Sequence, residues 1–552
     1  MSAAAELETL TDLDHHFAEF INHIGGGEGS LIQNTTASLS RAVRDGHICL
    51  DLSKTETDQA KLLECSAIGT PDKEAPLILD QNGRLYLRRY WLYEKRLAAA
   101  LLSKAKSRKR DNRKLEGTQK EAIARALGGN LTIITGGPGT GKTTTVLEIL
   151  RQLIEKNSDI SLRVALAAPT GKAAGRLEET LRAGIEKLPV SQEIKDQIPS
   201  KASTIHRLLG ARSGGSNYYY NQRNPLPLDV LVIDEASMVA LPLMTKLFDA
   251  LPPKCRVVLL GDRDQLASVD PGAVLADIVD AAVNESSTLN GSVVSLTENF
   301  RFRKQSAIYR CSSAVRQGAI DDVLEILNEK SSADLSGTAL PVGEEFQKRL
   351  AEAVTGGFSK AVKAQDPSTA LKEFGRFRIL CALRRGPFGV TGLNRRIEEY
   401  LRAADLISAD SGEHYRGKPI LITQNDYQLQ LYNGDIGVLF PDVSDSDFSR
   451  IWAWFLGPDG TPRKFSPARL PEHDVAYAMT VHKAQGSEFD QVLFVLPDRD
   501  SAVLSRELIY TGITRARKKV EIWFKEEVLT EAIGRKAVRY SGLTDALLRE
   551  AK

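Results

Sequence analysis

The stretch GGPGTGKT, residues 136–143, decides the fold of this chain. It follows the apolar run LTIIT (131–135) and precedes TTTVLEILRQLI (143–154), so it joins a predicted strand to a predicted helix. The spacing fits G-x-x-x-x-G-K-[ST], a loop whose backbone amides and following helix N-terminus bind phosphates. We expect Lys142 to reach the β- and γ-phosphates and Thr143 to ligate Mg²⁺. The expected nucleotide-binding residues are Gly136, Gly137, Pro138, Gly139, Thr140, Gly141, Lys142, Thr143 and Thr144.

Short apolar runs on both sides of this loop alternate with helical patterns. The first series continues through RVALAAPT (163–170), LDVLVIDE (228–235), RVVLLGD (256–262) and SVVSLTE (292–298). A second series consists of RFRILCAL (376–383), QVLFVL (491–496) and KVEIWF (519–524). Strands separated by helical crossovers predict parallel sheets covered on both faces. The fold class expected is therefore α/β, with two phosphate-loop-type domains.

The length and composition bound the remaining organisation. A chain of 552 residues predicts three or four domains, and 42% hydrophobic with 26% charged residues excludes a disordered, collagen-like or coiled-coil protein. Basic and acidic residues number 73 and 71, so net charge does not decide for or against a nucleic-acid partner. No apolar run is long enough for a bilayer, and the N-terminus lacks a signal-peptide pattern, so a cytoplasmic protein is expected. Five scattered cysteines favour reduced thiols and disfavour structural zinc, iron-sulfur centres and disulfides.

The predicted domains follow from these changes in pattern. Residues 104–114, KAKSRKRDNRK, form either a solvated linker or a basic edge that faces nucleic acid. Asn433-Gly434 between strand-like runs predicts a hairpin within a small SH3-like β insertion. The expected division is a helical N-terminal domain (1–105), a first RecA-like domain (106–300), a second one (301–411 and 471–535), the β insertion (412–470) and a C-terminal tail (536–552).

Two acidic residues complete the predicted nucleotide site. In LDVLVIDEAS, Asp234 and Glu235 follow a strand directly, where a carboxylate can hold Mg²⁺ and a second one can orient and deprotonate water. Acids at a helix N-terminus are common, so this pair gains its meaning from the phosphate loop upstream. Together the two motifs predict nucleoside triphosphate hydrolysis.

Arg515, in TRAR after a strand of the second series, is a candidate arginine finger. An arginine that completes a phosphate site from another domain lets the nucleotide control closure of the two domains. The alternative is a structural arginine on the surface.

Further motifs occur in a definite order: VALAAPTGKAAGRL (164–177), TIHRLLG (204–210), GDRDQLASVDPG (261–272), LTENFRF (296–302) and AYAMTVHKAQGSEFDQV (476–492). With LIYTGITRARKKV (508–520), this order resembles the superfamily-1 helicases, over roughly residues 110–530, and within them the 5′-to-3′ group that includes RecD.

This resemblance assigns further roles. It implies that Arg301 is a second finger, that Gln265 senses the γ-phosphate and that Gln119 brackets adenine, hence ATP as substrate. It also implies DNA contacts by small polar groups that hold a backbone without reading sequence. The implied DNA-binding residues are Pro169, Thr170, Lys172, Thr204, His206, Thr480, His482, Lys483 and Gln485; helix capping or core packing is the alternative for each.

The segments 380–401 and 415–439 and the short N-terminal region resemble the RecD family, the α subunits of exodeoxyribonuclease V. The resemblance implies a bacterial motor subunit that processes double-strand DNA ends with RecB-like and RecC-like subunits and carries no nuclease site. It docks through its N-terminal domain, with GRLYLRRYWLYEKRLA (83–98) as either an interface helix or a helix packed on its own motor domain. Residues 211–227, with three tyrosines, form either a strand-separating pin or an ordinary loop. The rival hypotheses are a stand-alone RecD-like helicase and, from another class, an ATP-dependent assembly switch.

Overall fold

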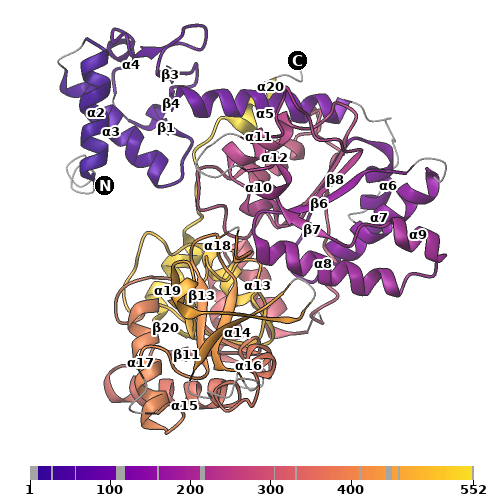
Figure 1. Ribbon diagram of the computed structural model, residues 1–552. Helices are drawn as coiled ribbons and strands as arrows, with labels where there is room; N and C mark the ends of the chain where they lie inside the picture. The colour runs from indigo at the N-terminus through magenta and orange to yellow at the C-terminus, as the bar shows by residue number, and fades with distance from the viewer. Residues whose placement is uncertain are drawn as a thin grey trace.

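The computed structural model has three bodies, an N-terminal domain and two α/β domains (Figure 1). It describes residues 10–26, 29–55, 57–106, 118–157, 161–211, 218–303, 305–329, 332–408, 412–426, 428–442, 450–457 and 460–549. Most of the basic segment 104–114 lies outside these residues. Within the described part of the chain, no helix is both long and apolar enough to cross a membrane.

The N-terminal domain combines the predicted helices with a small sheet. Helices α2 (Asp12–Ile24), α3 (Ser30–Arg44) and α4 (Gln59–Leu62) pack beside a four-stranded sheet. The sheet order is β1 (Cys49–Asp51), β4 (Arg84–Leu87), β3 (Leu77–Leu79) and β2 (Ile68–Gly69). The sequence analysis predicted only helices here, because strands of two to four residues are too short to show a period of two.

A long helix, α5 (Arg88–Lys106), connects this domain to the rest of the chain. It packs on α11 (Leu241–Asp249) of the first α/β domain, and Tyr90, Leu97 and Leu101 are buried at the contact. Lys104 Nζ donates a hydrogen bond to Cys255 O at 2.7 Å. Within the segment 83–98, the helical part from Arg88 onward packs on its own α/β domain, as the second of its two readings expected, while docking on a partner stays a prediction.

The first α/β domain contains a six-stranded parallel sheet. Its order is β10 (Val293–Ser295), β5 (Leu131–Thr135), β9 (Arg256–Gly261), β8 (Val230–Ile233), β6 (Val164–Ala168) and β7 (Ala202–Thr204). One face is covered by α6 (Gln119–Gly128), α7 (Lys142–Lys156) and α8 (Gly171–Glu186), and the other by α11 and α12 (Val274–Val283). Because the strands are parallel, the segments after β5, β6, β8 and β9 emerge at one edge of the sheet.

The second α/β domain contains a five-stranded parallel sheet. Its order is β11 (Leu335–Ala339), β20 (Ala516–Phe524), β19 (Phe489–Val495), β12 (Phe377–Cys381) and β18 (Ala478–Thr480). One face packs on α13 (Ala307–Gln317), α14 (Ile320–Asn328), α18 (Arg506–Ile513) and α19 (Glu526–Gly534). The other packs on α15 (Gly343–Val362), α16 (Pro367–Phe374) and α17 (Val390–Ala403). The edge strand β11 and strand β18 were not among the predicted strands.

The β insertion is an antiparallel sheet with its own small core. Its order is β16 (Pro462–Phe465), β15 (Ile451–Leu456), β14 (Ile436–Pro441), β13 (Lys418–Ile422) and β17 (His473–Val475). The predicted hairpin lies between β13 and β14, and Gly434 N, at a φ of 99°, donates to Ile422 O at 2.9 Å. The described residues of the run before it, 428–432, form turns and a single bridge instead of a strand. The SH3-like topology stays a prediction.

The C-terminal segment is ordered and returns to the beginning of the chain. After α19 it leaves the second α/β domain, and α20 (Leu543–Arg549) packs on α5 and α12, where Leu543 and Leu547 are fully buried (Figure 1). Ile48 N donates to Tyr540 O at 2.8 Å, and Arg84 forms an ion pair with Asp545. The predicted tail is thus a strap across the N-terminal domain and the first α/β domain.

Candidate ATP site and DNA groove

The phosphate loop has the backbone geometry that its glycines allow. Gly139 and Gly141 have φ angles of 84° and 79°, in the left-handed region that favours glycine. A Cβ on Gly139 would collide with the Cβ of Arg301, and one on Gly141 would collide with the amide nitrogen of Gln119. Gln119 Nε2 also contacts Thr140 O at 3.4 Å. The loop therefore has Gln119 on one side and the Arg301 segment on the other.

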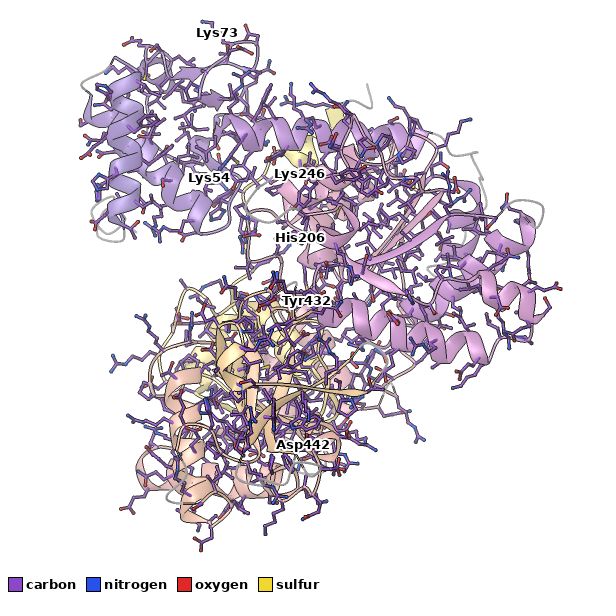
Figure 2. The ribbon with its side chains drawn as sticks, viewed as in Figure 1. Lys54, Lys73, His206, Lys246, Tyr432 and Asp442 are labelled. Carbon is purple, nitrogen blue, oxygen red and sulfur yellow. The ribbon has the colours of Figure 1, made fainter. Side chains whose placement is uncertain are left out.

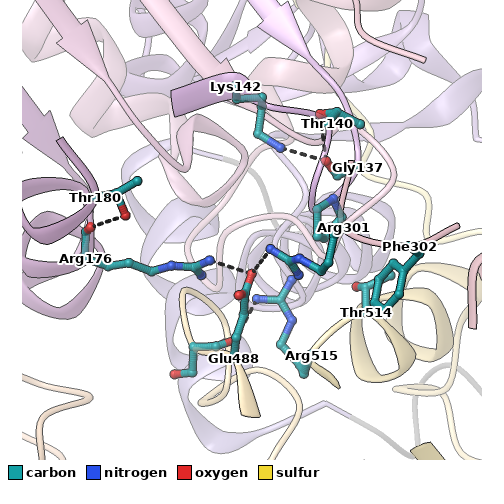
Figure 3. A network of polar contacts seen from close by, with 12 residues as sticks. Gly137, Thr140, Lys142, Arg176, Thr180, Arg301, Phe302, Glu488, Thr514 and Arg515 are labelled. Atoms are coloured by element: carbon teal, nitrogen blue, oxygen red, sulfur yellow. Dashed lines mark hydrogen bonds and ion pairs between the residues drawn. The ribbon is translucent and has the colours of Figure 1, made fainter. Parts of the chain in front are cut away.

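Lys142 folds back over the loop that it follows. Its Nζ donates to Gly136 O at 2.5 Å and to Gly137 O at 3.1 Å, and Thr140 Oγ1 donates to Gly137 O at 2.9 Å (Figure 3). Lys142, Thr143 and Thr144 form the first turn of α7, whose backbone amides carry partial positive charge. The ammonium group and the free amides thus occupy the edge of the sheet where an anion is best stabilised.

Asp234 and Glu235 lie at the same edge, directly after β8. Burial and the neighbouring Glu235 carboxylate raise the pKa of Asp234, while Lys142 and Arg176 oppose this shift. Glu235 has a φ of 52°, which is unusual for a residue with a side chain and directs the backbone away from the strand. The strained turn therefore holds Asp234 near Lys142 and Glu235 near Arg176 and Arg515.

Three arginines from different elements converge beside the loop (Figure 3). Arg176 Nη2 of α8 and Arg301 Nη2 lie 2.5 and 2.6 Å from the same oxygen, Glu488 Oε1. Arg515 lies close enough to lower the pKa of Glu488 as well; burial would raise that pKa, but the three arginines bring it to about 2. Glu488 is thus ionised and balances part of a strongly positive cluster.

Gln265 connects the two α/β domains behind this cluster. Its Nε2 donates to Asp262 Oδ2 at 3.0 Å, and its Oε1 accepts from Arg515 Nη2 at 3.1 Å. Asp262 also accepts from the Tyr510 hydroxyl at 2.9 Å. Leu266 N donates to Thr511 Oγ1 at 3.0 Å, and Gln485 Nε2 donates to Leu266 O at 2.8 Å. The short segment 262–266 of the first domain is thus hydrogen-bonded to four residues of the second domain, Arg515, Tyr510, Thr511 and Gln485.

A groove of about 540 Å³ lies between the two domains on the other side of this segment. The structure brings all nine predicted DNA-binding residues to it, although they come from three separate stretches of sequence. Figure 2 shows His206 of the first domain facing Tyr432 of the β insertion across the junction. Their shared location is a geometric finding, and contact with DNA remains a proposal.

Burial changes the charge of the basic groups in this groove. Burial and the nearby Arg378 lower the pKa of Lys172 to about 7, although Asp435 opposes them. Burial also lowers the pKa of His206, His482 and Lys483. Water would normally stabilise these cations, so a polyanion that supplies negative charge would restore the protonated forms of the two lysines.

The candidate pin lies at one end of the groove. Tyr218 lines the groove and its ring centroid is 6.1 Å from that of His206, whereas Tyr219 is 51% exposed. Tyr219 and Tyr220 are held by backbone hydrogen bonds to Gly210 and Leu209. Residues 212–217, the tip of the predicted pin, lie outside the described residues.

Comparison with known proteins identifies the family. The RecBCD enzyme subunit RecD of Mycolicibacterium smegmatis is 37% identical over 570 residues, which cover 98% of this chain and 98% of that protein. The chain belongs to the RecD family. The family model for the N-terminal domain of RecBCD enzyme subunit RecD matches residues 6–61. Models for an AAA domain and a UvrD-like helicase C-terminal domain match 119–271 and 475–522.

Two other proteins are similar to this chain at lower sequence identity. The ATP-dependent RecD2 DNA helicase of Deinococcus radiodurans is 28% identical, over 89% of this chain but only 61% of that protein. The crystal structure of Bacteroides Pif1 bound to single-stranded DNA matches with a TM-score of 0.42 and 16% identity, over 76% of this chain and 94% of that chain. As a RecD family member, the chain is a nucleotide-binding, ATP-dependent DNA helicase, the motor type of subunit in RecBCD.

In this RecD family member, the structure adds residues to the ATP cleft and the groove that the sequence analysis did not select. Arg176 and Glu488 lie within quoted motifs, AGRL and QGSEF, but their ion pair joins two domains and has no local signal. Tyr90, Asn425, Tyr432 and Asn433 also line the groove. The strongest available signal for Tyr432 and Asn433 was their place beside the predicted Asn433-Gly434 turn.

Proposed function

We propose that this chain is a 5′-to-3′ single-strand DNA translocase and helicase. The observation that carries the proposal is that one segment of the first domain, 262–266, bonds to the second domain between the ATP site and the groove. Closure of the cleft on ATP would move the two walls of the groove relative to each other. If each wall of the groove holds the DNA backbone in turn, ATP hydrolysis advances the protein along one DNA strand.

The proposed roles in hydrolysis follow from the geometry. Glu235 orients and deprotonates the attacking water, Lys142 binds the β- and γ-phosphates, and Arg301 and Arg515 approach the γ-phosphate from the other side of the cleft. Gln119 lies beside Thr140, where it can bracket adenine. Gln265 links the position of Arg515 to that of Asp262.

The residues also fit a magnesium ion. Asp234 is a buried carboxylate whose pKa is raised, so a divalent cation beside it would relieve the cost of burying its charge. We propose that Asp234 and the Thr143 hydroxyl hold Mg²⁺, since this ion uses one or two protein oxygens together with substrate phosphates. When bound, Mg²⁺ neutralises charge on the phosphate oxygens.

We also propose that the chain works in a heterotrimer with RecB-like and RecC-like subunits at double-strand DNA ends. Support comes from α2, where Leu13, Phe20 and Ile24 are 68%, 59% and 40% exposed and lie on one face of the helix. An apolar stripe of this kind is typical of a protein interface. Replacing Leu13 and Phe20 by serine should abolish co-purification with the co-expressed partner subunits while leaving the ATPase rate unchanged.

The domain division 1–105, 106–300, 301–411 with 471–535, 412–470 and 536–552 remains our proposal for the units that move. The contacts of α20 with α5 and α12 support grouping the described residues of the strap, 536–549, with the first α/β domain.

The polarity is tested on two duplexes that differ only in a 5′ or a 3′ single-stranded tail. With ATP and Mg²⁺, the protein alone or in its complex should unwind only the 5′-tailed duplex. Lys142→Gln should abolish unwinding, because it removes the phosphate contact. Unwinding of the 3′-tailed duplex would contradict the proposed direction. Stable activity of the chain without partners would instead favour the stand-alone helicase.

A further inference from the structure

Glu488 occupies a position that an anion would take in the ATP cleft. Its Oε1 lies 2.5 Å from Arg176 Nη2 and 2.6 Å from Arg301 Nη2, so both guanidinium groups point at one oxygen (Figure 3). Arg301 lies directly against Gly139 of the phosphate loop. The carboxylate is therefore the negative charge that stands beside the loop and between the arginines of two domains.

The cluster has donors left over for a second anion. Within the described part of the chain, Arg301 Nη1 is buried without a hydrogen-bond partner. A buried guanidinium nitrogen without a partner carries a desolvation cost that a phosphate oxygen would remove. Arg515, by contrast, donates to Thr511 O, Ser487 O and Gln265 Oε1. The cleft thus holds one arginine with a buried nitrogen that has no partner and another whose three nitrogens each have one.

Arg176 lies in another part of the fold than the two candidate arginine fingers, Arg301 and Arg515. It belongs to α8 of the first domain, the same domain as the phosphate loop, and it lowers the pKa of Asp234. Its neighbours connect it to the DNA groove: Lys172, one helical turn earlier, lines the groove, and Gln485, three residues before Glu488, does so too. The ion pair Arg176–Glu488 therefore links the two domains beside both sites.

We infer that Glu488 is a positioning residue that competes with the γ-phosphate for Arg176 and Arg301, and that Arg176 is a third arginine that contacts the γ-phosphate once Glu488 is displaced. The inference rests on the proposed ATP site. The displaced carboxylate would release the contact between α8 and the second domain. Binding of ATP, but not of ADP, would thereby change the ion pair that lies next to the groove.

The test compares two nucleotides that differ in the terminal phosphate group, ADP and ATPγS, by fluorescence titration with labelled analogues. Glu488→Gln removes the competing charge, so it should tighten ATPγS binding about tenfold while ADP binding changes less than about twofold. Arg176→Gln should weaken ATPγS binding about tenfold and leave ADP binding unchanged. An unchanged ratio of the two affinities in either variant would overturn the inference.

Asp490→Asn is the matched control. Asp490 is two residues from Glu488, and its carboxylate pairs with Arg517 and Lys518 away from the cluster, so the same chemical exchange should leave both affinities unchanged. Thermal melting shows whether each variant is folded. If Glu488→Gln does not fold, Arg176→Gln decides, because its side chain is 38% exposed. Lys142→Gln should weaken both nucleotides; if it weakens neither, the ATP site itself is wrong.

Discussion

Arg515 Nη2 donates a hydrogen bond to Gln265 Oε1 over 3.1 Å, although 250 residues separate them in the sequence. The bond crosses from the second α/β domain to the first, and Gln265 simultaneously binds Asp262. Each of the three guanidinium nitrogens of Arg515 donates a hydrogen bond, to Thr511 O, Ser487 O and Gln265 Oε1. The transfer of Arg515 from Gln265 to a phosphate would make domain closure depend on the nucleotide.

We expect Arg515→Gln to lower the DNA-stimulated ATPase rate by about 10³-fold or more, because an arginine finger stabilises charge that develops in the transition state. Nucleotide binding should be retained. Arg517→Gln is the control, since Arg517 lies two residues further along, in β20, and pairs with Asp490. Steady-state ATPase rates with saturating oligonucleotide measure both. A normal rate for Arg515→Gln would remove this residue from the site.

Glu235→Gln should separate binding from hydrolysis. The amide cannot accept the proton of the attacking water, so the ATPase rate should fall by roughly 10²- to 10⁴-fold. Affinities for ATP and for single-stranded DNA should remain within a factor of about two, because the amide is almost the same size and leaves Lys142 in place. Single-turnover hydrolysis combined with nucleotide titration distinguishes the two effects. Equal losses of binding and hydrolysis would indicate a structural role instead.

DNA binding should weaken as pH rises above 7. The pKa of Lys172 is about 7, so the side chain loses its charge in this range, and a strand phosphate can be held only after a proton is taken up. Affinity for oligothymidylate should fall by up to about tenfold per pH unit between pH 7 and 9. The pKa values of His206 and His482 are lowered from 6.5, so both rings are neutral throughout.

Lys172→Arg provides the comparison for this pH series, because a guanidinium stays protonated and should flatten the curve. Lys483 and Lys246 also line the groove and have lowered pKa values, so any remaining slope in Lys172→Arg reports on them. Lys172→Gln should reduce the salt dependence of binding by roughly 0.7 in the logarithmic slope, the value for one phosphate contact. An unchanged pH profile in both variants would contradict a phosphate contact by Lys172.

The contacts of the strap should contribute more to the free energy of unfolding at low pH than at high pH. Glu94 accepts hydrogen bonds from Ser541 Oγ at 2.7 Å and Gly542 N at 2.9 Å, yet burial raises its pKa to about 7. Burial, with Glu94 as a further cause, raises the pKa of Asp277 to about 8. Both values lie above those of the unfolded chain, so this stability is complete below about pH 4 and is lost as pH rises through 7 to 8.

The expected loss between pH 6 and 8.5 is about 4 kcal/mol, or a few degrees in Tm, because Glu94 titrates over about one pH unit of this window and Asp277 over about two. Differential scanning fluorimetry measures it. Glu94→Gln should remove about a third of the decline, because an amide does not titrate while burial still raises the pKa of Asp277. Arg84 lies beside this pair; burial opposes its charge, but the hydrogen bond to Asp545 raises its pKa, so Arg84 stays charged and does not account for the slope. A steeper decline in Glu94→Gln would show that the sign is wrong.

The sequence was most informative where a local motif has to be continuous. GGPGTGKT and the five apolar runs of the first series predicted β5, β6, β8, β9 and β10, because buried parallel strands are short apolar stretches. Strand β11 escaped because LSGTA (335–339) is an edge strand with two polar residues and a glycine and has no apolar run. Strand β7 has only three residues, too few for a period to appear.

The site residues that could not be predicted from the sequence are those that depend on contacts between distant parts of the chain. Lys142 and Thr143 are adjacent to the loop that they serve, so a motif found them. The partners of Arg176, Gln265 and Arg515 depend on how two domains are packed, which neither periodicity nor spacing records. The strap shows the same limit, because Leu543 and Leu547 look like part of any short amphipathic helix until α5 and α12 are seen beneath them.

The route of the chain constrains how the motor can move. The polypeptide enters the second α/β domain once, after β10, and leaves it once, through the strap, and both crossings are anchored on the same body. A body suspended at two points can swing about the line between them but cannot rotate freely around either. The two α/β domains are therefore joined by a double hinge. The range of their relative motion in each ATP cycle is limited by these two connecting segments as well as by the contacts in the cleft.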